Sequence, residues 1–246
     1  MYTTKLVIAY DGTHYAGWQI QPNATSIQAL VQQAVRTIVR ESVHVIGSGR
    51  TDAGVHALGQ VAHFCTTLSV DPILTLRSLN GLLPADIRVL STMPVTSDFH
   101  AQRSALSKIY HYRLWLGPVH DPFHRRTSHH FPHAFDLNAL QEALPHLQGT
   151  HDFTSFANAA TEGAASKNPV RTLSLELILE PSGLTFVFQA NGFLYKMVRN
   201  LTGALIDVGR GKLVPADIPC ILAARDRRLA PAAAPAHGLT LVQVFY

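Results

Sequence analysis

The stretch GSGRTDAGVHALGQVAHF, residues 47–64, contains the residue types and spacing best suited to chemistry. Arg50 and Asp52 are two positions apart, so their side chains point to the same side of an extended chain. A carboxylate presented in this way can act as a nucleophile or as a general base. The neighbouring glycines, which allow unusual backbone conformations or the close approach of another molecule, are Gly47, Gly49 and Gly54. The pattern indicates a site or, alternatively, a surface turn with a local ion pair.

A second candidate is the loop IAYDGTHYAGWQIQP, residues 8–22, which combines aromatic, glycine and amide residues. Tyr15, Trp18 and Gln19 are suited to stacking on planar ligands or to packing against a ribose-phosphate chain. The alternative interpretation is that this loop packs its aromatic rings into its own domain.

Two further clusters combine aromatic and basic side chains. Tyr110 and Tyr112 share one face of a predicted strand that also carries Lys108, although tyrosine on a strand often serves sheet packing alone. Lys196 and Arg199 are three positions apart at the start of a predicted helix, so we expect them to share a face. A solvated basic helix face would have the same pattern.

The histidine-rich stretch does not predict a metal site. Its histidines are His124, His129, His130 and His133. Pro132 interrupts any helix that would align His129 with His133, and no cysteine lies nearby. The chain also lacks a glycine-rich phosphate loop, a dinucleotide-binding fingerprint and a serine elbow, so neither ATP nor a redox cofactor is expected.

The composition is that of a globular protein with a substantial core. Of 246 residues, 47% are hydrophobic and only 15% are charged, which excludes a disordered or fibrous chain. The net charge of +4 and the pI of about 9.2 favour an anionic partner such as nucleic acid. We expect Cys65 and Cys220 to be buried thiols. No signal peptide or membrane-length apolar run is evident, so the sequence predicts a soluble, cytoplasmic protein.

Hydrophobic periodicity predicts two α+β halves, residues 1–104 and 105–246, each with a mainly antiparallel sheet and helices packed on one face. The first half is expected to contain a strand at 7–10, a helix at 27–39 capped by Ser26, a strand to about 67, a helix at 72–83 and a strand at 87–95. The second is expected to contain a strand at 107–116, a helix capped by Asp136, a hairpin turning at 181–183, helices at 197–211 and 215–224, and a strand at 239–246. The prolines of LAPAAAPAHGL predict an ordered, non-helical connection before that last strand.

Residues 47–64 closely resemble the signature of the bacterial tRNA pseudouridine synthase A family. The resemblance extends over nearly the whole chain, because further stretches match in order: AYDGTHYAGWQIQP, LNGLLPADIRV, FHAQRSALSKIYHYRL, HDFTSFAN, GFLYKMVRNLTGALIDVGRGK and PAHGLTLVQVFY. One departure is Pro231, where the family often has glycine, and it could alter the connection before the last strand. The catalytic set is unaffected.

This resemblance implies a pseudouridine synthase fold with the active cleft between the two halves. It also implies isomerisation of uridine to pseudouridine at positions 38, 39 and 40 of the tRNA anticodon stem-loop, by a homodimer that uses no cofactor. Asp52 matches the family's essential aspartate, Arg199 the basic residue that pairs with it, and Tyr110 the tyrosine that stacks on the target base and assists proton transfer. Arg50 would fill the stack after base flipping, and the glycines near Asp52 would let the RNA backbone approach.

The remaining candidates are expected to contact RNA elsewhere. They are Tyr15, Trp18, Gln19, Lys196, Arg125 and Arg126, of which the last two would dock the tRNA body. Two other functions remain possible. One is a non-catalytic RNA-binding protein on the same scaffold, and the other is a carboxylate-based glycosidase or nucleosidase, which would normally need two carboxylates flanking the bond.

Overall fold

The computed structural model describes residues 1–158 and 168–246, and the chain divides into two compact units. Unit 1 comprises Met1–Leu106 together with Thr240–Tyr246, and unit 2 comprises Ser107–Leu239. The last strand therefore belongs to unit 1, whereas the sequence placed it in the second half. The reason is backbone pairing, because Thr240 and Leu241 align in parallel with His56 and Ala57.

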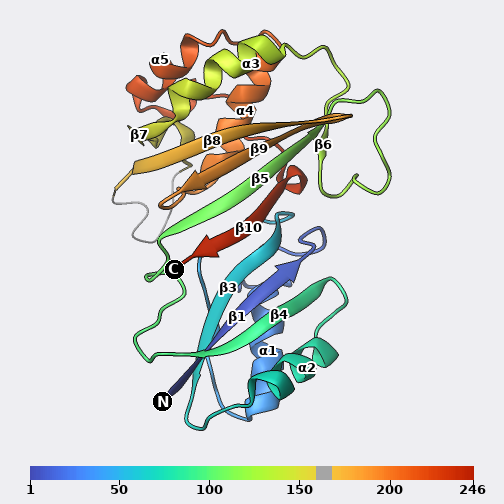
Figure 1. Ribbon diagram of the computed structural model, residues 1–246, viewed down its shortest axis with the longest axis vertical. Coiled ribbons are helices and arrows are strands. Elements are labelled where there is room, and N and C mark those ends of the chain that lie inside the picture. The colour runs from blue at the N-terminus through green and yellow to red at the C-terminus, as the bar shows by residue number, and fades with distance from the viewer. Residues whose placement is uncertain (159–167) are drawn as a thin grey trace. The chain divides into compact units, whose positions relative to one another are not determined.

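Unit 1 contains a sheet in the order β4-β1-β3-β10 (Figure 1). Its strands are β1 (Tyr2–Tyr10), β2 (Ile46–Gly47), β3 (His56–Thr66), β4 (Ile87–Val95) and β10 (Leu239–Phe245). Strand β1 pairs antiparallel with both β3 and β4, and β2 adds a short antiparallel pairing to β3. The two helices are α1 (Ile27–Val39) and α2 (Pro72–Leu82), which contact each other.

The local sequence explains these elements. The Ser26 hydroxyl accepts a hydrogen bond from the Ala29 N–H and so caps α1 where the sequence predicted it. Helical spacing of Ile27, Val31 and Val35 gives α1 one buried face. In β1 the alternating residues are buried as the period of a strand requires, and the strand ends before Asp11-Gly12 as predicted.

Unit 2 contains the antiparallel order β5-β9-β8-β7, with β6 parallel to β5. The strands are β5 (Ser107–Trp115), β6 (His129–His130), β7 (Gly149–Asp152), β8 (Val170–Glu180) and β9 (Gly183–Ala190). The helices are α3 (Leu137–Ala143), α4 (Met197–Gly209) and α5 (Asp217–Ala224), which Figure 1 shows grouped on one side of this sheet. Short 3-10 helices cover Leu144–Leu147, Thr154–Phe156, Arg227–Leu229 and Ala236–Gly238.

The predicted features of unit 2 are confirmed in detail. The Asp136 carboxylate caps α3 by accepting from the N–H groups of Asn138 and Ala139. The β8–β9 hairpin turns at Pro181-Ser182, since Glu180 already pairs with Gly183. The molecule is thus an α+β protein with mainly antiparallel pairing, as the sequence predicted.

One expectation is wrong. Cys65 and Cys220 are exposed, because Cys65 lies at an outward position of β3 and Cys220 on the outer side of α5. Lys196 is the N-cap residue of α4 and has a left-handed backbone (φ 58°), so the helix begins one residue after it, and its sharing of a face with Arg199 stays a prediction. In the part of the chain that the structure describes, no helix is both long and apolar enough to cross a membrane.

Candidate active site

The loop that carries Asp52, residues 48–55, is held by the neighbouring loop of unit 1. The Trp18 N–H donates to the Thr51 carbonyl at 3.1 Å, and the Gly54 N–H donates to the Tyr15 carbonyl at 3.4 Å. The hydroxyls of Tyr10 and Thr51 are hydrogen-bonded at 2.8 Å. Asp52 therefore lies between two anchored positions.

The exposure of residues 50–52 agrees with the prediction that the side chains of Arg50 and Asp52 point to the same side of the chain. Thr51 is buried, whereas Arg50 is exposed and Asp52 is half-buried. Because alternate side chains of an extended segment point in opposite directions, the inward Thr51 leaves Arg50 and Asp52 facing outward. Gly54 has a φ of 76°, which confirms that the turn after Asp52 uses a backbone conformation favouring glycine.

Gln60 fixes the beginning of this loop from within β3. The Ser48 hydroxyl donates to Gln60 Oε1 at 2.7 Å, and Gln60 Nε2 donates to the Gly49 carbonyl at 3.1 Å. Both side chains are fully buried. A buried amide that satisfies a loop backbone acts as a fixed support, because breaking these bonds would leave polar groups unpaired.

His56 connects the first loop to the end of the Asp52 loop. The Gly12 N–H donates to His56 Nδ1 at 3.1 Å. A carboxylate oxygen of Asp11 lies 3.2 Å from the same nitrogen. His56 and Gln60 are not among the candidates that the sequence pattern indicates. Both could have been found as polar residues inside a strand that otherwise buries apolar side chains.

The predicted RNA contacts of Trp18 and Tyr15 are not supported by their positions. Trp18 is only 2% exposed and stacks on Tyr10, with ring centroids 6.2 Å apart. Its indole fills the space above Gly47, where an added Cβ would lie 2.5 Å from the ring. Gly47 therefore makes room for Trp18 rather than for an RNA backbone, and the alternative of aromatic packing within the domain holds.

Tyr15 also packs within unit 1, where its hydroxyl makes a polar contact. It is 9% exposed, and its hydroxyl donates to an Asp86 carboxylate oxygen at 2.6 Å. Burial, and then the bond to Asp86, raise the pKa of Tyr15 well above its ordinary value, so the hydroxyl remains a donor. The remaining candidate of this loop, Gln19, is half-buried.

Unit 2 presents Tyr110 from the buried face of β5. Its ring meets Phe193 edge-on, with centroids 5.0 Å apart. The next tyrosine on that face, Tyr112, is buried and donates its hydroxyl to the Pro235 carbonyl at 2.9 Å. Burial raises the pKa of Tyr112. Tyr112 therefore has a structural role. Tyr110 is itself only 8% exposed, and its contact with a target base stays a prediction.

Arg199 is held at the start of α4 by the connection that precedes β10. Its Nε donates to the Ala234 carbonyl at 2.8 Å, and the Ala234 N–H donates back to the Arg199 carbonyl at 2.8 Å. Arg227 in turn donates to the Pro231 carbonyl at 2.8 Å. The proline at position 231 thus leaves an ordered connection, because the interaction uses its carbonyl.

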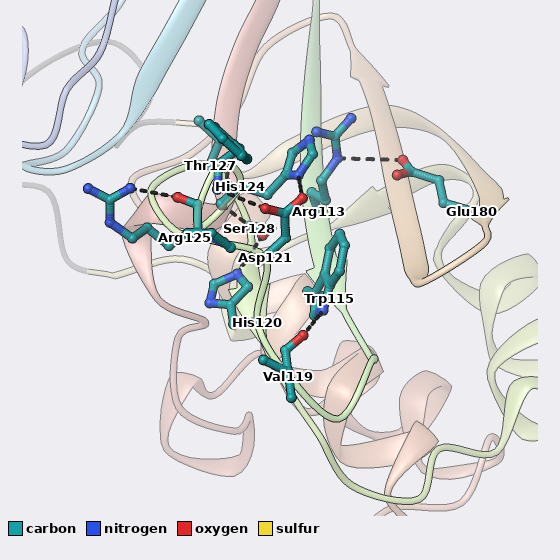
Figure 2. A network of polar contacts seen from close by, with 12 residues as sticks. Arg113, Trp115, Val119, His120, Asp121, His124, Arg125, Thr127, Ser128 and Glu180 are labelled. Atoms are coloured by element: carbon teal, nitrogen blue, oxygen red, sulfur yellow. Dashed lines mark hydrogen bonds and ion pairs between the residues drawn. The ribbon is translucent and has the colours of Figure 1, made fainter.

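The loop between β5 and β6 carries the predicted docking residues Arg125 and Arg126, and both are exposed. Figure 2 shows the polar network that shapes this loop, in which Arg125 donates to the Pro122 carbonyl and His124 pairs with Asp121 at 2.7 Å. The Phe123 N–H and His124 hold the pKa of Asp121 below its ordinary value. Among residues 1–158 and 168–246, no group of three His, Cys, Asp or Glu side chains could hold a metal ion.

The candidate residues are thus divided between the units. Unit 1 carries Arg50, Asp52, Tyr15, Trp18 and Gln19, and unit 2 carries Tyr110, Arg125, Arg126, Lys196 and Arg199. The structure describes each unit by itself, so the predicted cleft between them stays a prediction.

Comparison with known proteins extends over both units. A family model described as tRNA pseudouridine synthase matches residues 6–102 and 143–246. A relative named tRNA pseudouridine synthase A 1, from Protochlamydia amoebophila (strain UWE25), is 54% identical over 248 residues, which cover 100% of this chain and 97% of the relative. Proteins named tRNA pseudouridine synthase A from Exiguobacterium sibiricum and Chlamydia muridarum are each 46% identical, covering 98% and 99% of this chain and 96% and 92% of their own lengths.

Proposed function

The chain belongs to the tRNA pseudouridine synthase family, and on this premise we propose that it isomerises uridine to pseudouridine at positions 38, 39 and 40 of the tRNA anticodon stem-loop. The observation that carries this proposal is the geometry of the Asp52 loop. Its backbone is anchored on both sides while the carboxylate side chain stays partly accessible. Such preorganisation is what a catalytic group needs, because little ordering remains to be done during the reaction.

The chemistry requires one carboxylate. The bond between C1′ and uracil N1 breaks, the base turns, and a bond forms between C1′ and C5. The C5 proton is then released and N1 takes up a proton, so the product is an isomer with no net redox change. Asp52 acts either as a nucleophile at C1′ or at the uracil ring, or as a base at C2′. Because all bonds are redistributed within one nucleotide, we propose that the reaction uses no metal or nucleotide cofactor.

The other site residues have distinct tasks in this proposal. A uridine within a stem must leave the stack before a side chain can reach it, at a cost of a few kcal/mol. Arg50, exposed and next but one to Asp52, fills the vacated stack and holds the displaced backbone. Tyr110 stacks on the flipped uracil and assists proton transfer, and the Arg199 guanidinium pairs with the ionised Asp52 carboxylate.

We further propose that the protein acts as a cytoplasmic homodimer on one tRNA. A net charge of +4 per chain is small for holding a whole tRNA, and two chains double it. In this arrangement one protomer binds the tRNA body while the other receives the anticodon arm. Sedimentation of the protein with and without tRNA tests this proposal, and a monomer with one tRNA bound would contradict it.

The test of the catalytic assignment is Asp52→Asn. We expect pseudouridine formation to be abolished while the dissociation constant for tRNA stays within about tenfold of the wild-type value, since affinity comes from many phosphate contacts. Mapping pseudouridine in treated tRNA measures the first quantity, and filter binding measures the second. Asp98→Asn, an exposed carboxylate of unit 1, is the matched control and should retain activity.

Three outcomes separate the candidate functions. Pseudouridine made by the wild type and lost in Asp52→Asn supports the proposal, whereas near-normal turnover of that variant would refute the role of Asp52. Release of free uracil from labelled tRNA would indicate a nucleosidase. Binding of tRNA by the wild type without any product would indicate a non-catalytic RNA-binding protein.

A further inference from the structure

The turn between β9 and α4 contains an unusual backbone conformation at Lys196. Among the residues that the structure describes, the other non-glycine residues with positive φ are Asn23, in a turn, and Arg40 and Arg225, at the C-terminal caps of α1 and α5, where this conformation is common. Lys196 instead precedes a helix, and its side chain makes no capping hydrogen bond. A left-handed backbone at such a residue persists only where the surroundings enforce it, and such positions are frequent in ligand-binding segments.

The surroundings of Lys196 do enforce this turn. The side chain of Leu194 is buried before it, and that of Met197 is buried after it. The Met197 N–H donates to the Leu194 carbonyl at 3.1 Å, and the Asn158 N–H donates to the Tyr195 carbonyl at 3.0 Å. The turn is thus fixed by packing on both sides and by two backbone hydrogen bonds.

One result of this turn is that Tyr195 is presented outward. Tyr195 is 46% exposed although the side chains of Leu194 before it and Met197 after it are buried. The Lys196 ammonium lies over its ring, 5.3 Å from the centroid. The turn therefore displays a rigid aromatic ring together with a cation, the combination with which proteins bind unpaired nucleotides by stacking and by attraction to phosphate.

This pair also lies next to the residues that the proposed function uses. Phe193, two positions before Tyr195, contacts the ring of Tyr110. Arg199, four positions after Tyr195, is in the first turn of α4. Tyr195 is therefore presented by a segment that joins two side chains of the proposed active site.

We propose that Tyr195, with Lys196 over its ring, is a stacking subsite for an unpaired RNA base next to the target uridine. This inference rests on the proposed function, since it assumes that the substrate is an RNA with a flipped nucleotide. RNA is favoured over a protein partner because the ammonium complements a phosphate backbone. Stacking also tolerates any base, which suits a site whose neighbouring nucleotide differs among three target positions.

The experiment measures binding of an anticodon stem-loop that carries 2-aminopurine beside the target uridine. Stacking contributes to affinity in proportion to aromatic overlap, so Tyr195→Phe should stay within about twofold of the wild type, whereas Tyr195→Ala and Tyr195→Leu should each weaken binding by roughly tenfold. The change in 2-aminopurine fluorescence on binding should persist in Tyr195→Phe and disappear in the other two. Tyr2→Ala, which removes a tyrosine that is 54% exposed in unit 1, is the control and should bind normally.

Lys196→Met supplies a second, independent readout. It should lower the salt dependence of stem-loop binding by about one unit if the ammonium contacts one phosphate. Combined with Tyr195→Ala, its effect on affinity should be less than additive, because the two side chains act together. Thermal unfolding checks that each variant is folded.

Several results would overturn the subsite. Normal binding by Tyr195→Ala would do so, as would equal binding by Tyr195→Leu and Tyr195→Phe, because the ring would then act only as apolar surface. A change in sedimentation with unchanged binding of the stem-loop would identify Tyr195 as a protein contact. Because these results concern affinity and 2-aminopurine fluorescence and not product, they are distinct from a failure of the proposed function, in which the wild type binds the stem-loop but forms no pseudouridine.

Discussion

The position of the Asp52 carboxylate depends on side chains that do no chemistry themselves. Trp18 is packed against Gly47 and Tyr10, and its backbone N–H holds the Thr51 carbonyl. A change in this packing would move the loop that carries Asp52, the proposed catalytic group. Because displacements of about 1 Å can reduce catalysis by about a hundredfold, the residues that support the loop should matter to turnover almost as much as the site residues.

Gly47→Ala tests whether the packing of Trp18 positions the Asp52 loop. The added methyl group would lie 2.5 Å from the Trp18 indole, so the ring must move. We expect a loss of about 1–3 kcal/mol in the free energy of unfolding, with turnover falling more than tRNA affinity. Urea unfolding and single-turnover rates measure the two effects.

Gly81→Ala is the matched control for this substitution. Gly81 lies in α2, and an added Cβ would meet no atom within 4 Å. We expect it to stabilise the protein by roughly 0.5–1 kcal/mol, because alanine favours a helix, and to leave turnover unchanged. If Gly47→Ala behaved like Gly81→Ala, the packing of Trp18 would not position the loop.

At the scale of elements, one histidine attaches the segment after β4 to the sheet of unit 1, and a second holds the turn within that segment. His63, on β3, accepts a hydrogen bond at Nδ1 from the Ala101 N–H at 3.2 Å. His100 accepts at Nδ1 from the N–H groups of Gln102 and Arg103, both at 3.2 Å. The two rings are 5.0 Å apart. Each acceptor is lost when its nitrogen is protonated, so this attachment requires neutral histidines.

The protein should therefore lose stability in mild acid. Burial, and then the neighbouring His100, lower the pKa of His63, and burial, and then Arg103, lower the pKa of His100 below the ordinary value of 6.5. A histidine pKa that is lower in the folded state favours the neutral form. Its contribution is complete above pH 6.5 and declines as the pH falls below that value toward the folded-state pKa. Urea unfolding at pH 7.5, 6.5 and 5.5 measures this decline.

A double substitution isolates the contribution of these two histidines. In His63→Asn/His100→Asn each side chain can still accept a hydrogen bond but cannot titrate. We expect the free energy of unfolding to fall less between pH 7.5 and 5.5 than in the wild type. An unchanged pH dependence would assign the acid sensitivity to other groups, such as His129, whose pKa burial lowers to about 4.

At the scale of the whole molecule, the small net positive charge should limit the attraction between the protein and its tRNA substrate. The chain has 20 basic and 16 acidic side chains, so individual exposed arginines should contribute measurably to the attraction. Arg125 and Arg126 are exposed on a loop that its own polar network shapes (Figure 2). A preformed loop binds phosphate without a large ordering cost.

Changing Arg125 and Arg126 together to alanine should weaken tRNA binding and reduce the salt slope by roughly one to two units, if each contacts one phosphate. Dissociation constants over a salt series measure the slope. Arg77→Ala, an exposed arginine of α2, is the control for loss of positive charge alone. A wild-type slope in the double variant would mean that this arginine pair is only solvated surface.

The sequence by itself determined most of the helices and strands, although it did not predict the short strands β2, β6 and β7, and it pointed to the Asp52 loop as the candidate site. Helical spacing after Ser26, alternation through Tyr110 and Tyr112, and the turn at 181–183 were sufficient because each depends on residues close together in the chain. The resemblance then identified the family, since long motifs in one order rarely arise by chance.

Only the tertiary structure decided which faces become covered and by what. Trp18 is buried because Gly47, from a distant segment, leaves room for its indole, and Cys65 is exposed although His63, on the same side of β3, is buried. The last strand joins unit 1 through a parallel pairing with residues near position 56. Periodicity shows which residues share a face, but the partner of that face is selected by packing and hydrogen bonding between segments far apart in the chain, and no local pattern contains that information.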